Sequence, residues 1–375
     1  MNRAVVLSVT VAALVSATVL TWIDVRQQRE FRRLIASGDA ALARDQTIAA
    51  IEAFSGAMAL RRTSMLPYLK RGDTYRRRGD FEAALRDLTR ATALDPMAPR
   101  PVELLGDVTE ALGQHQRAIG LYNRYIALDD RAPHVLYKLA AAEYRDGRRA
   151  AAIDSLRKSL AIDQKFAEAH ELLGVCLRAD GRTDQALRSL TRAVALNPTL
   201  ETARLELADL YDSLGRRRDE IEQLEAFAAL VPDRPDALIR VGMTYARMER
   251  TDAAVLTLTR AAERFPENAA ASVALARVWL DLADERGDAA AVRKAVDLLR
   301  PVATRSDAPS DALALYGRAL LASGDAREAE QTLQQATSRS PVDASTLMYL
   351  ARAAGRMRHA AIEREATAQH DALVR

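Results

Sequence analysis

The sequence predicts an all-α protein in which antiparallel helix pairs stack in a row behind an N-terminal membrane-spanning helix. One observation is an internal repeat. GDFEAALRDLTRATALDP at residues 79–96 returns almost unchanged as GRTDQALRSLTRAVALNP at 181–198, and the offset of 102 residues is three times 34. A second is composition. The chain is 49% apolar but only 5% aromatic, which suits helical layers of Ala and Leu better than β-sheets.

The first element is an uncharged run from Ala4 to Ile23, AVVLSVTVAALVSATVLTWI. Twenty helical residues measure about 30 Å, the thickness of the hydrocarbon core of a bilayer. Trp22 lies at the end of the run, where an aromatic ring suits the membrane interface. A cleaved signal peptide is the alternative, since VSA at 15–17 has the small residues of a cleavage site, but the apolar run continues past it. We expect an uncleaved single-pass anchor in the plasma (inner) membrane.

The side of the membrane is predicted from the flanking charges. Only Arg3 precedes the span, whereas four arginines follow it closely: Arg26, Arg29, Arg32 and Arg33. The positive-inside rule favours a cytoplasmic array. Export to the periplasm is the alternative, because short anchors of this kind also precede exported domains.

No residue that breaks a helix lies between the span and the first repeat. The first glycine is Gly38 and the first proline is Pro67. We therefore expect one continuous helix, without a flexible stalk, that leads from the membrane into the array and holds the four arginines near the lipid headgroups.

The body of the chain divides into windows of 34 residues from residue 31, and seven windows run to residue 268 without an insertion. A small residue occupies position eight, and small residues also dominate position twenty; these let two antiparallel helices approach closely. A bulky residue at position twenty-four fills the space beside them. Glycine near position fifteen ends the first helix. The eighth position holds Gly38, Gly72, Gly106, Ala140, Gly174, Ala208 and Gly242, and the twenty-fourth holds Phe54, Leu88, Tyr122, Leu156, Leu190, Leu224 and Leu258.

This combination of positions resembles the tetratricopeptide repeat family over nearly the whole chain after the anchor. The resemblance implies a right-handed α-solenoid in which each helix pair depends on its neighbours for burial. Glu220 at position twenty, and Tyr125 and Phe227 at the usually small position twenty-seven, depart from the pattern and predict local repacking. After an anchor and juxtamembrane helix at 1–30, the predicted repeats are 31–64, 65–98, 99–132, 133–166, 167–200, 201–234, 235–268, 269–309 and 310–343, with a partial repeat and capping helix at 344–375.

The eighth repeat is irregular, because its second helix resumes seven residues late, at Ala295. The charged insertion near residues 284–291 predicts that both helices gain about one turn and that the hairpin projects. Pro301 then falls inside the second helix and should kink it.

No pattern of catalytic residues stands out. The single cysteine, Cys176, excludes an intramolecular disulfide and occupies an apolar helical position, which predicts a buried structural thiol. The sequence holds no metal-binding, phosphate-loop or nucleophile-elbow motif, so we expect no enzyme activity, no cofactor and no metal. Two arginine clusters, 76–78 and 216–218, fall at turns. The net charge of +3 and the absence of an aromatic platform do not favour a nucleic-acid partner.

The resemblance also implies a binding groove lined by the first helix of each repeat. Tyr137 and Tyr144 would anchor an extended peptide or a helix; the alternative is that they only pack between helices. Asp107 and Lys138 replace the asparagine pair of the carboxylate clamp, so recognition of chaperone tails is not expected. The candidate groove residues are Asp73, Arg76, Arg100, Glu103, Asp107, Glu110, His134, Tyr137, Tyr144, Glu171, Arg178 and Asp209.

We therefore expect a non-catalytic, membrane-anchored scaffold that binds protein partners. A partner segment of basic or mixed charge with an apolar anchor would suit the third to fifth repeats. Two alternatives stay open: a membrane oligomer formed by self-association of the array, and a regulatory subunit of a cell-envelope enzyme complex. Fold alone does not distinguish these functions.

Overall fold

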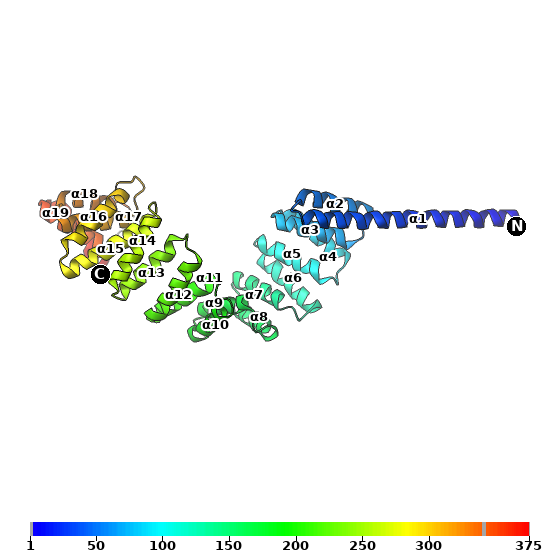
Figure 1. Ribbon diagram of the computed structural model, residues 1–375, viewed down its shortest axis with the longest axis horizontal. Helices are drawn as coiled ribbons and strands as arrows, with labels where there is room; N and C mark the ends of the chain where they lie inside the picture. The colour runs from blue at the N-terminus through cyan, green and yellow to red at the C-terminus, as the bar shows by residue number, and fades with distance from the viewer. Residues whose placement is uncertain (1–2, 340–342, 375) are drawn as a thin grey trace. The chain divides into compact units, whose positions relative to one another are not determined.

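The computed structural model describes residues 3–339 and 343–374, and within them the side chains from residue 16 onward except Ala17. All regular structure in these ranges is α-helical (Figure 1). The helices are α1 (Arg3–Leu42), α2 (Thr47–Leu60), α3 (Met65–Arg78), α4 (Phe81–Leu94), α5 (Pro99–Ala111), α6 (His115–Leu128), α7 (Pro133–Arg145), α8 (Arg149–Ile162), α9 (Ala167–Ala179), α10 (Thr183–Leu196), α11 (Glu201–Ser213), α12 (Arg217–Leu230), α13 (Pro235–Arg247), α14 (Thr251–Arg264), α15 (Ala269–Arg286), α16 (Ala289–Ala303), α17 (Ser310–Ser323), α18 (Ala326–Thr337), α19 (Ala344–Met357) and α20 (Ala360–Val374).

The helices form consecutive hairpins that follow the 34-residue period. The odd-numbered helices from α3 to α15 begin at Met65, Pro99, Pro133, Ala167, Glu201, Pro235 and Ala269, each 34 residues after the last. Two compact units result, Met1–Leu196 and Asn197–Arg375. Within each unit every hairpin packs on the next along the chain. The expected all-α architecture of stacked helix pairs is thus confirmed.

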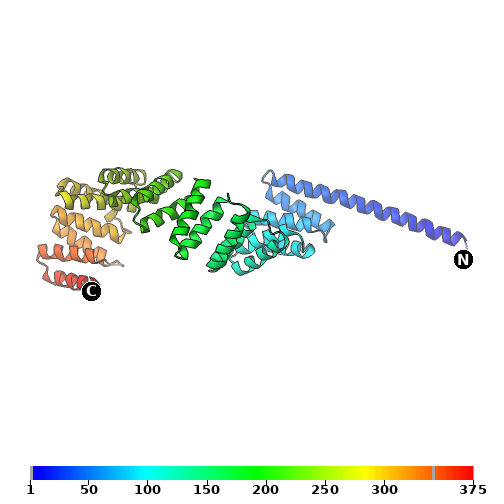
Figure 2. The same cartoon turned by 90° about the horizontal axis from the view of Figure 1, so that it is seen from below.

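The first helix is uninterrupted, as the absence of early glycine and proline predicts. α1 spans 40 residues, and its second half packs on α2 through Phe31 and Ala41. Its first half extends beyond the neighbouring helices of its unit (Figures 1 and 2). Of the predicted span Ala4–Ile23, the side chains of residues 4–15 lie outside the described ones. Among the side chains that are described, no helix is long and apolar enough to cross a membrane.

The close approach of the two helices in each hairpin explains the small residue at position eight. A Cβ atom added to Gly106 would lie 2.5 Å from Cε1 of Tyr122, and one added to Gly174 would lie 2.5 Å from Cγ of Leu190. Real atoms do not tolerate such distances without displacement. The bulky residue sixteen positions later therefore fills the space that the missing side chain leaves open.

Glu220 lies in the interior among side chains that donate hydrogen bonds to it. Its side chain is 2% exposed, and its carboxylate accepts hydrogen bonds from Arg217 (3.1 Å), from the hydroxyl of Thr244 (2.9 Å) and from Arg247. Tyr125 and Phe227 are both buried. The hairpins are therefore kept at these three departures from the pattern, since α6 and α12 have 14 residues each; the local repacking stays a prediction.

The insertion in the eighth hairpin lengthens both helices at their shared turn, as predicted. α15 has 18 residues, against 13 in α13. α16 begins six residues before Ala295, whereas α14 begins three residues before the corresponding Ala254. Gly287 ends α15 in the left-handed conformation (φ 66°), and the carboxylate of Asp288 caps α16. Pro301 lies inside α16 near its C-terminal end; the kink expected there stays a prediction.

The C-terminal tail forms a whole hairpin, where a partial repeat was expected. α19 buries five residues, but α20 buries only Ala366. α20 therefore presents most of its side chains to solvent, which is the arrangement that a terminal capping helix needs.

Cys176 is fully buried in α9, and burial raises the pKa of its thiol to about 11. The reactive thiolate is therefore scarce at neutral pH. We expect a thiol reagent such as DTNB to leave the folded chain unlabelled at pH 8 and to label it rapidly in guanidinium chloride. Fast labelling of the folded chain would show that α9 opens in the native state.

Candidate functional site

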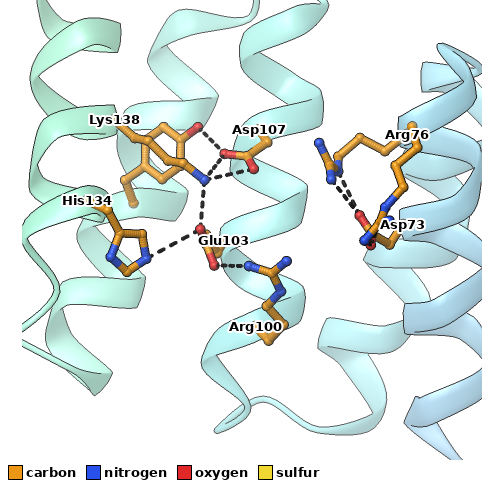
Figure 3. A network of polar contacts seen from close by, with 9 residues as sticks. Asp73, Arg76, Arg100, Glu103, Asp107, His134 and Lys138 are labelled. Atoms are coloured by element: carbon orange, nitrogen blue, oxygen red, sulfur yellow. Dashed lines mark hydrogen bonds and ion pairs between the residues drawn. The ribbon is translucent and has the colours of Figure 1, made fainter. Parts of the chain in front are cut away.

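The candidate groove residues lie on the first helices of five hairpins. Asp73 and Arg76 belong to α3, and Glu171 and Arg178 to α9. Asp209 belongs to α11, in the other compact unit. The structure brings Arg100, Glu103 and Asp107 of α5 together with His134 of α7 (Figure 3). Glu110 of α5 and Tyr137 of α7 line a hollow between the same helices.

Glu103 lies at the centre of this set and is buried, with 3% of its surface exposed. Its carboxylate accepts hydrogen bonds from Lys138 and Arg100, both at 2.7 Å, and Nε2 of His134 lies 3.6 Å away. Burial alone would raise the pKa of Glu103, but the bonds from Lys138 and Arg100 outweigh burial and hold the pKa below its ordinary value. Glu103 is therefore ionised and joins two hairpins; it does not offer a free charge to a partner.

Asp107 is neutralised by the same lysine. Nζ of Lys138 lies 2.8 Å from one carboxylate oxygen and 2.9 Å from the other, and the hydroxyl of Tyr122 donates a third bond at 2.9 Å. Burial and the negative charge of Asp107 raise the pKa of Tyr122 far above its ordinary value. The phenol consequently stays protonated and remains a donor.

Two other acids of the candidate groove are also paired with bases. Glu110 contacts Nδ1 of His115 at 3.0 Å and Arg145 at 2.5 Å. Asp73 accepts bonds from Arg76 at 2.7 Å and from Arg77 at 3.1 Å. The surface between α3 and α7 therefore carries charges of both signs in closed pairs.

A recurring ion pair between consecutive first helices is a feature that the sequence analysis missed. On the first helices, three aspartates pair with a base 31 residues later: Asp39 with Lys70 at 2.7 Å, Asp107 with Lys138 at 2.8 Å, and Asp209 with Arg240. The signal was available, because these acids occupy position nine and the bases occupy position six of the next window. Such pairs link neighbouring hairpins within each unit.

The arginine clusters at the turns are paired in a similar way. Besides Arg76 and Arg77, Arg78 binds Asp80 and stacks on the ring of Tyr75. In the second cluster, Arg216 binds Asp219, and Arg217 binds Asp212 and Glu220. These contacts agree with the prediction that the clusters are surface turns.

A hollow of about 530 Å³ opens between α5, α6 and α7. Its apolar lining comes from Ala111, Ala141 and the ring of Tyr137. Its polar lining comes from Asp107, Glu110, His115, Tyr122, Lys138 and Arg145. The ring of Tyr137 lines the hollow and also packs against the ring of Phe166, with the two ring centroids 5.2 Å apart. Tyr144 is half-buried and is not part of the lining. The binding role of the twelve candidate residues stays a prediction.

Comparison with known protein families gives a direct result. A tetratricopeptide repeat profile matches residues 69–133, 240–303 and 315–363, and a second profile of the same repeat matches residues 167–200. Together the matches cover more than half of the chain. The chain belongs to the tetratricopeptide repeat family. The hollow thus lies between the first helices of two consecutive tetratricopeptide repeats.

Solved tetratricopeptide repeat structures share the fold. The C-terminal part of a repeat protein from Cytophaga hutchinsonii is 18% identical, with a TM-score of 0.54 over 65% of this chain and 99% of its own. A repeat protein from Parabacteroides merdae is 15% identical, with a TM-score of 0.46 over 86% and 98%. YrrB, described as having an unusual peptide-binding site, is 21% identical, with a TM-score of 0.43 over 50% and 97%. No curated protein matches the chain.

Proposed function

We propose that this tetratricopeptide repeat protein is a non-catalytic, membrane-anchored scaffold that captures a segment of a partner protein between α5 and α7. The observation that carries the proposal is the hollow of about 530 Å³, in which the ring of Tyr137 and the side chains of Ala111 and Ala141 lie among charged and polar residues. A concave site of this kind suits one apolar or aromatic side chain of an extended peptide or a helix.

The chemistry of the hollow refines the expected partner. Glu103, Asp107 and Glu110 are already satisfied by Lys138, Arg100 and Arg145. A purely basic segment would have to displace these internal pairs. We therefore favour a segment of mixed charge. An apolar side chain of the segment enters the hollow, and its polar neighbours contact the polar residues at the rim of the hollow.

Membrane anchoring is supported by the apolar surface of α1. Five large apolar side chains of this helix are between 40% and 67% exposed: Val19, Leu20, Trp22, Ile23 and Val25. Four of them belong to the uncharged run from Ala4 to Ile23, and Val25 follows it after Asp24. Exposed apolar side chains gathered on one helix are typical of a surface that meets lipid or protein.

The array would stand on the cytoplasmic side, because arginines are concentrated after the span. Reporter fusions at the C-terminus test this: an active cytoplasmic reporter agrees with the proposal. An active periplasmic reporter would place the array outside the cytoplasm.

Capture of the partner should depend on Arg145, which lines the hollow and is 57% exposed in its side chain. Arg145→Glu places a like charge beside Glu110, and we expect the amount of partner crosslinked in membranes to fall about tenfold. Arg157→Glu is the matched control, because Arg157 is similarly exposed on α8 and is not part of the hollow. Equal crosslinking by the two variants would move the binding site away from α5–α7.

A further inference from the structure

We propose that the turn between α2 and α3 docks on anionic lipid headgroups, together with the segment of α1 that follows the membrane span. This inference rests on the proposed anchor and adds a lipid-binding surface to the repeat array. The surface, named here the basic collar, consists of Arg26, Arg29, Arg32, Arg33, Arg61 and Arg62.

The fold brings the turn back to the end of the span. Nη2 of Arg61, the residue that ends α2, lies 3.1 Å from a carboxylate oxygen of Asp24. The guanidinium of Arg61 also lies 5.8 Å from the centroid of the buried Phe31 ring. Residues 61–64 are thereby held beside the first residue after Ile23. Both views show α2 running along α1, and the start of α1 projecting beyond it (Figures 1 and 2).

The collar has a surplus of positive charge. Its two nearby acids are occupied, since Asp24 pairs with Arg61 and Glu30 pairs with Arg33 at 2.6 Å. Arg29, Arg32 and Arg62 are exposed, and within the described part of the chain no carboxylate lies at ion-pair distance from them. Each arginine near an anionic membrane surface adds about 1 kcal/mol of attraction.

The opposite edge of the same hairpins provides the contrast. There the arginines of the α3–α4 turn are neutralised, because Arg76 and Arg77 pair with Asp73, and Arg78 pairs with Asp80. At that opposite edge Arg44 is also exposed and has no ion pair within the described residues. The contrast is therefore one of number, with three unpaired arginines in the collar and one at the opposite turns.

Trp22 indicates where the basic collar lies relative to the membrane interface. The guanidinium of Arg26 lies 5.5 Å from the centroid of the Trp22 ring. An aromatic ring suited to the membrane interface is therefore in contact with a cation. Arg26 follows Ile23 by three residues, about 4.5 Å along the helix. Lipid phosphates at the end of the span are therefore within reach of Arg26, and the turn at 61–64 lies at the same level.

The test uses the full chain reconstituted in vesicles of phosphatidylcholine, alone or mixed with phosphatidylglycerol. A fluorophore is attached at the exposed turn through Thr63→Cys, since the buried Cys176 is not expected to label. Lipids that carry a headgroup quencher then report contact of the turn with the membrane. We expect stronger quenching when phosphatidylglycerol is present than in phosphatidylcholine alone.

Two charge variants decide whether the collar causes the contact. Arg29→Gln/Arg62→Gln removes two unpaired arginines and should lower the ratio of docked to undocked turns about thirtyfold. Arg44→Gln/Arg77→Gln removes the same charge at the opposite turns and should leave the ratio unchanged. Equal quenching with and without phosphatidylglycerol, or equal loss in both variants, would overturn the proposal.

The outcomes distinguish a failure of the collar proposal from a failure of the anchor proposal. Release of the chain from vesicles by alkaline carbonate would overturn the anchor, and the collar with it. Retention of the chain without quenching at position 63 would overturn the collar alone. A response of the fluorophore to single-stranded RNA but not to phosphatidylglycerol would assign the collar to nucleic acid and would likewise overturn the proposal.

Discussion

Replacing Lys138 with Met is expected to lower the free energy of unfolding by about 3 kcal/mol. One ammonium group serves both Glu103 and Asp107, at 2.7 and 2.8 Å. Without it, the buried carboxylate of Glu103 keeps only the flanking Arg100 and His134, and Asp107 keeps only the hydroxyl of Tyr122. Leaving a buried charge without its main partner costs more than the pair contributes when it is intact.

Urea unfolding of the full chain, with hydrogen exchange of the α5–α7 amides, measures this effect. Lys158→Met on α8 is the matched control, because Lys158 is exposed and the change should be nearly neutral. Glu103→Gln combined with Lys138→Met should recover part of the loss, since a neutral amide is cheaper to bury. If Lys138→Met were as stable as the control, the carboxylates would have to be solvated in the native state.

The same pairs have a pH signature. The pKa of Glu103 is held below its ordinary value of 4.5, so its stabilising contribution is present above pH 4.5 and is lost as the pH falls through the lowered value. Lys138→Met removes the main cause of that lowered pKa. The difference in stability between wild type and variant should therefore shrink as the pH is lowered from 7 to below 4.5. A constant difference would mean that Glu103 does not mediate the effect.

Gly106→Ala should destabilise the third hairpin by about 2 kcal/mol, although alanine is the better helix former. The new Cβ would lie 2.5 Å from Cε1 of Tyr122. That ring cannot swing aside without giving up its hydrogen bond to Asp107. The helices must separate instead, which disturbs the ion pairs that join this hairpin to the next.

Gly120→Ala isolates this packing effect. Gly120 also lies inside a helix of the same hairpin, but a Cβ atom there meets nothing within 4 Å. This variant should gain up to about 1 kcal/mol from helix propensity. Opposite signs of the two changes in thermal unfolding would confirm the close approach at Gly106. Stabilisation by both variants would show that α5 and α6 are farther apart than the structure indicates.

Much of the fold could be predicted from periodicity because the two helices of each hairpin pack against each other in the same way. Gly106 and Tyr122 are sixteen residues apart, and this spacing alone indicates that a bulky ring covers a glycine. The continuous α1 followed from the absence of early glycine and proline. The length of the C-terminal hairpin was harder to predict, because α20 buries only Ala366 and so leaves almost no apolar pattern to detect.

The candidate site could be predicted only in part. Family positions placed Asp107, Glu110 and Tyr137 on α5 and α7, two of the three helices that border the hollow. They did not indicate that Glu103 is buried or that Lys138 satisfies two acids, because a contact between residues 31 or 35 apart depends on how one hairpin is oriented on the next. A search for opposite charges at a spacing of 31 would have found the Asp107–Lys138 pair.

The ion pairs at a spacing of 31 also make the order of the repeats matter. Asp39, Asp107 and Asp209 each meet a base on the hairpin that follows, whereas Asp73 is followed at that spacing by Leu104 and pairs within its own helix. Precise excision of residues 133–166 would place Leu172 opposite Asp107. These charges therefore favour one order of the repeats. Repeats with similar backbones cannot be exchanged without breaking some of the ion pairs between neighbouring hairpins.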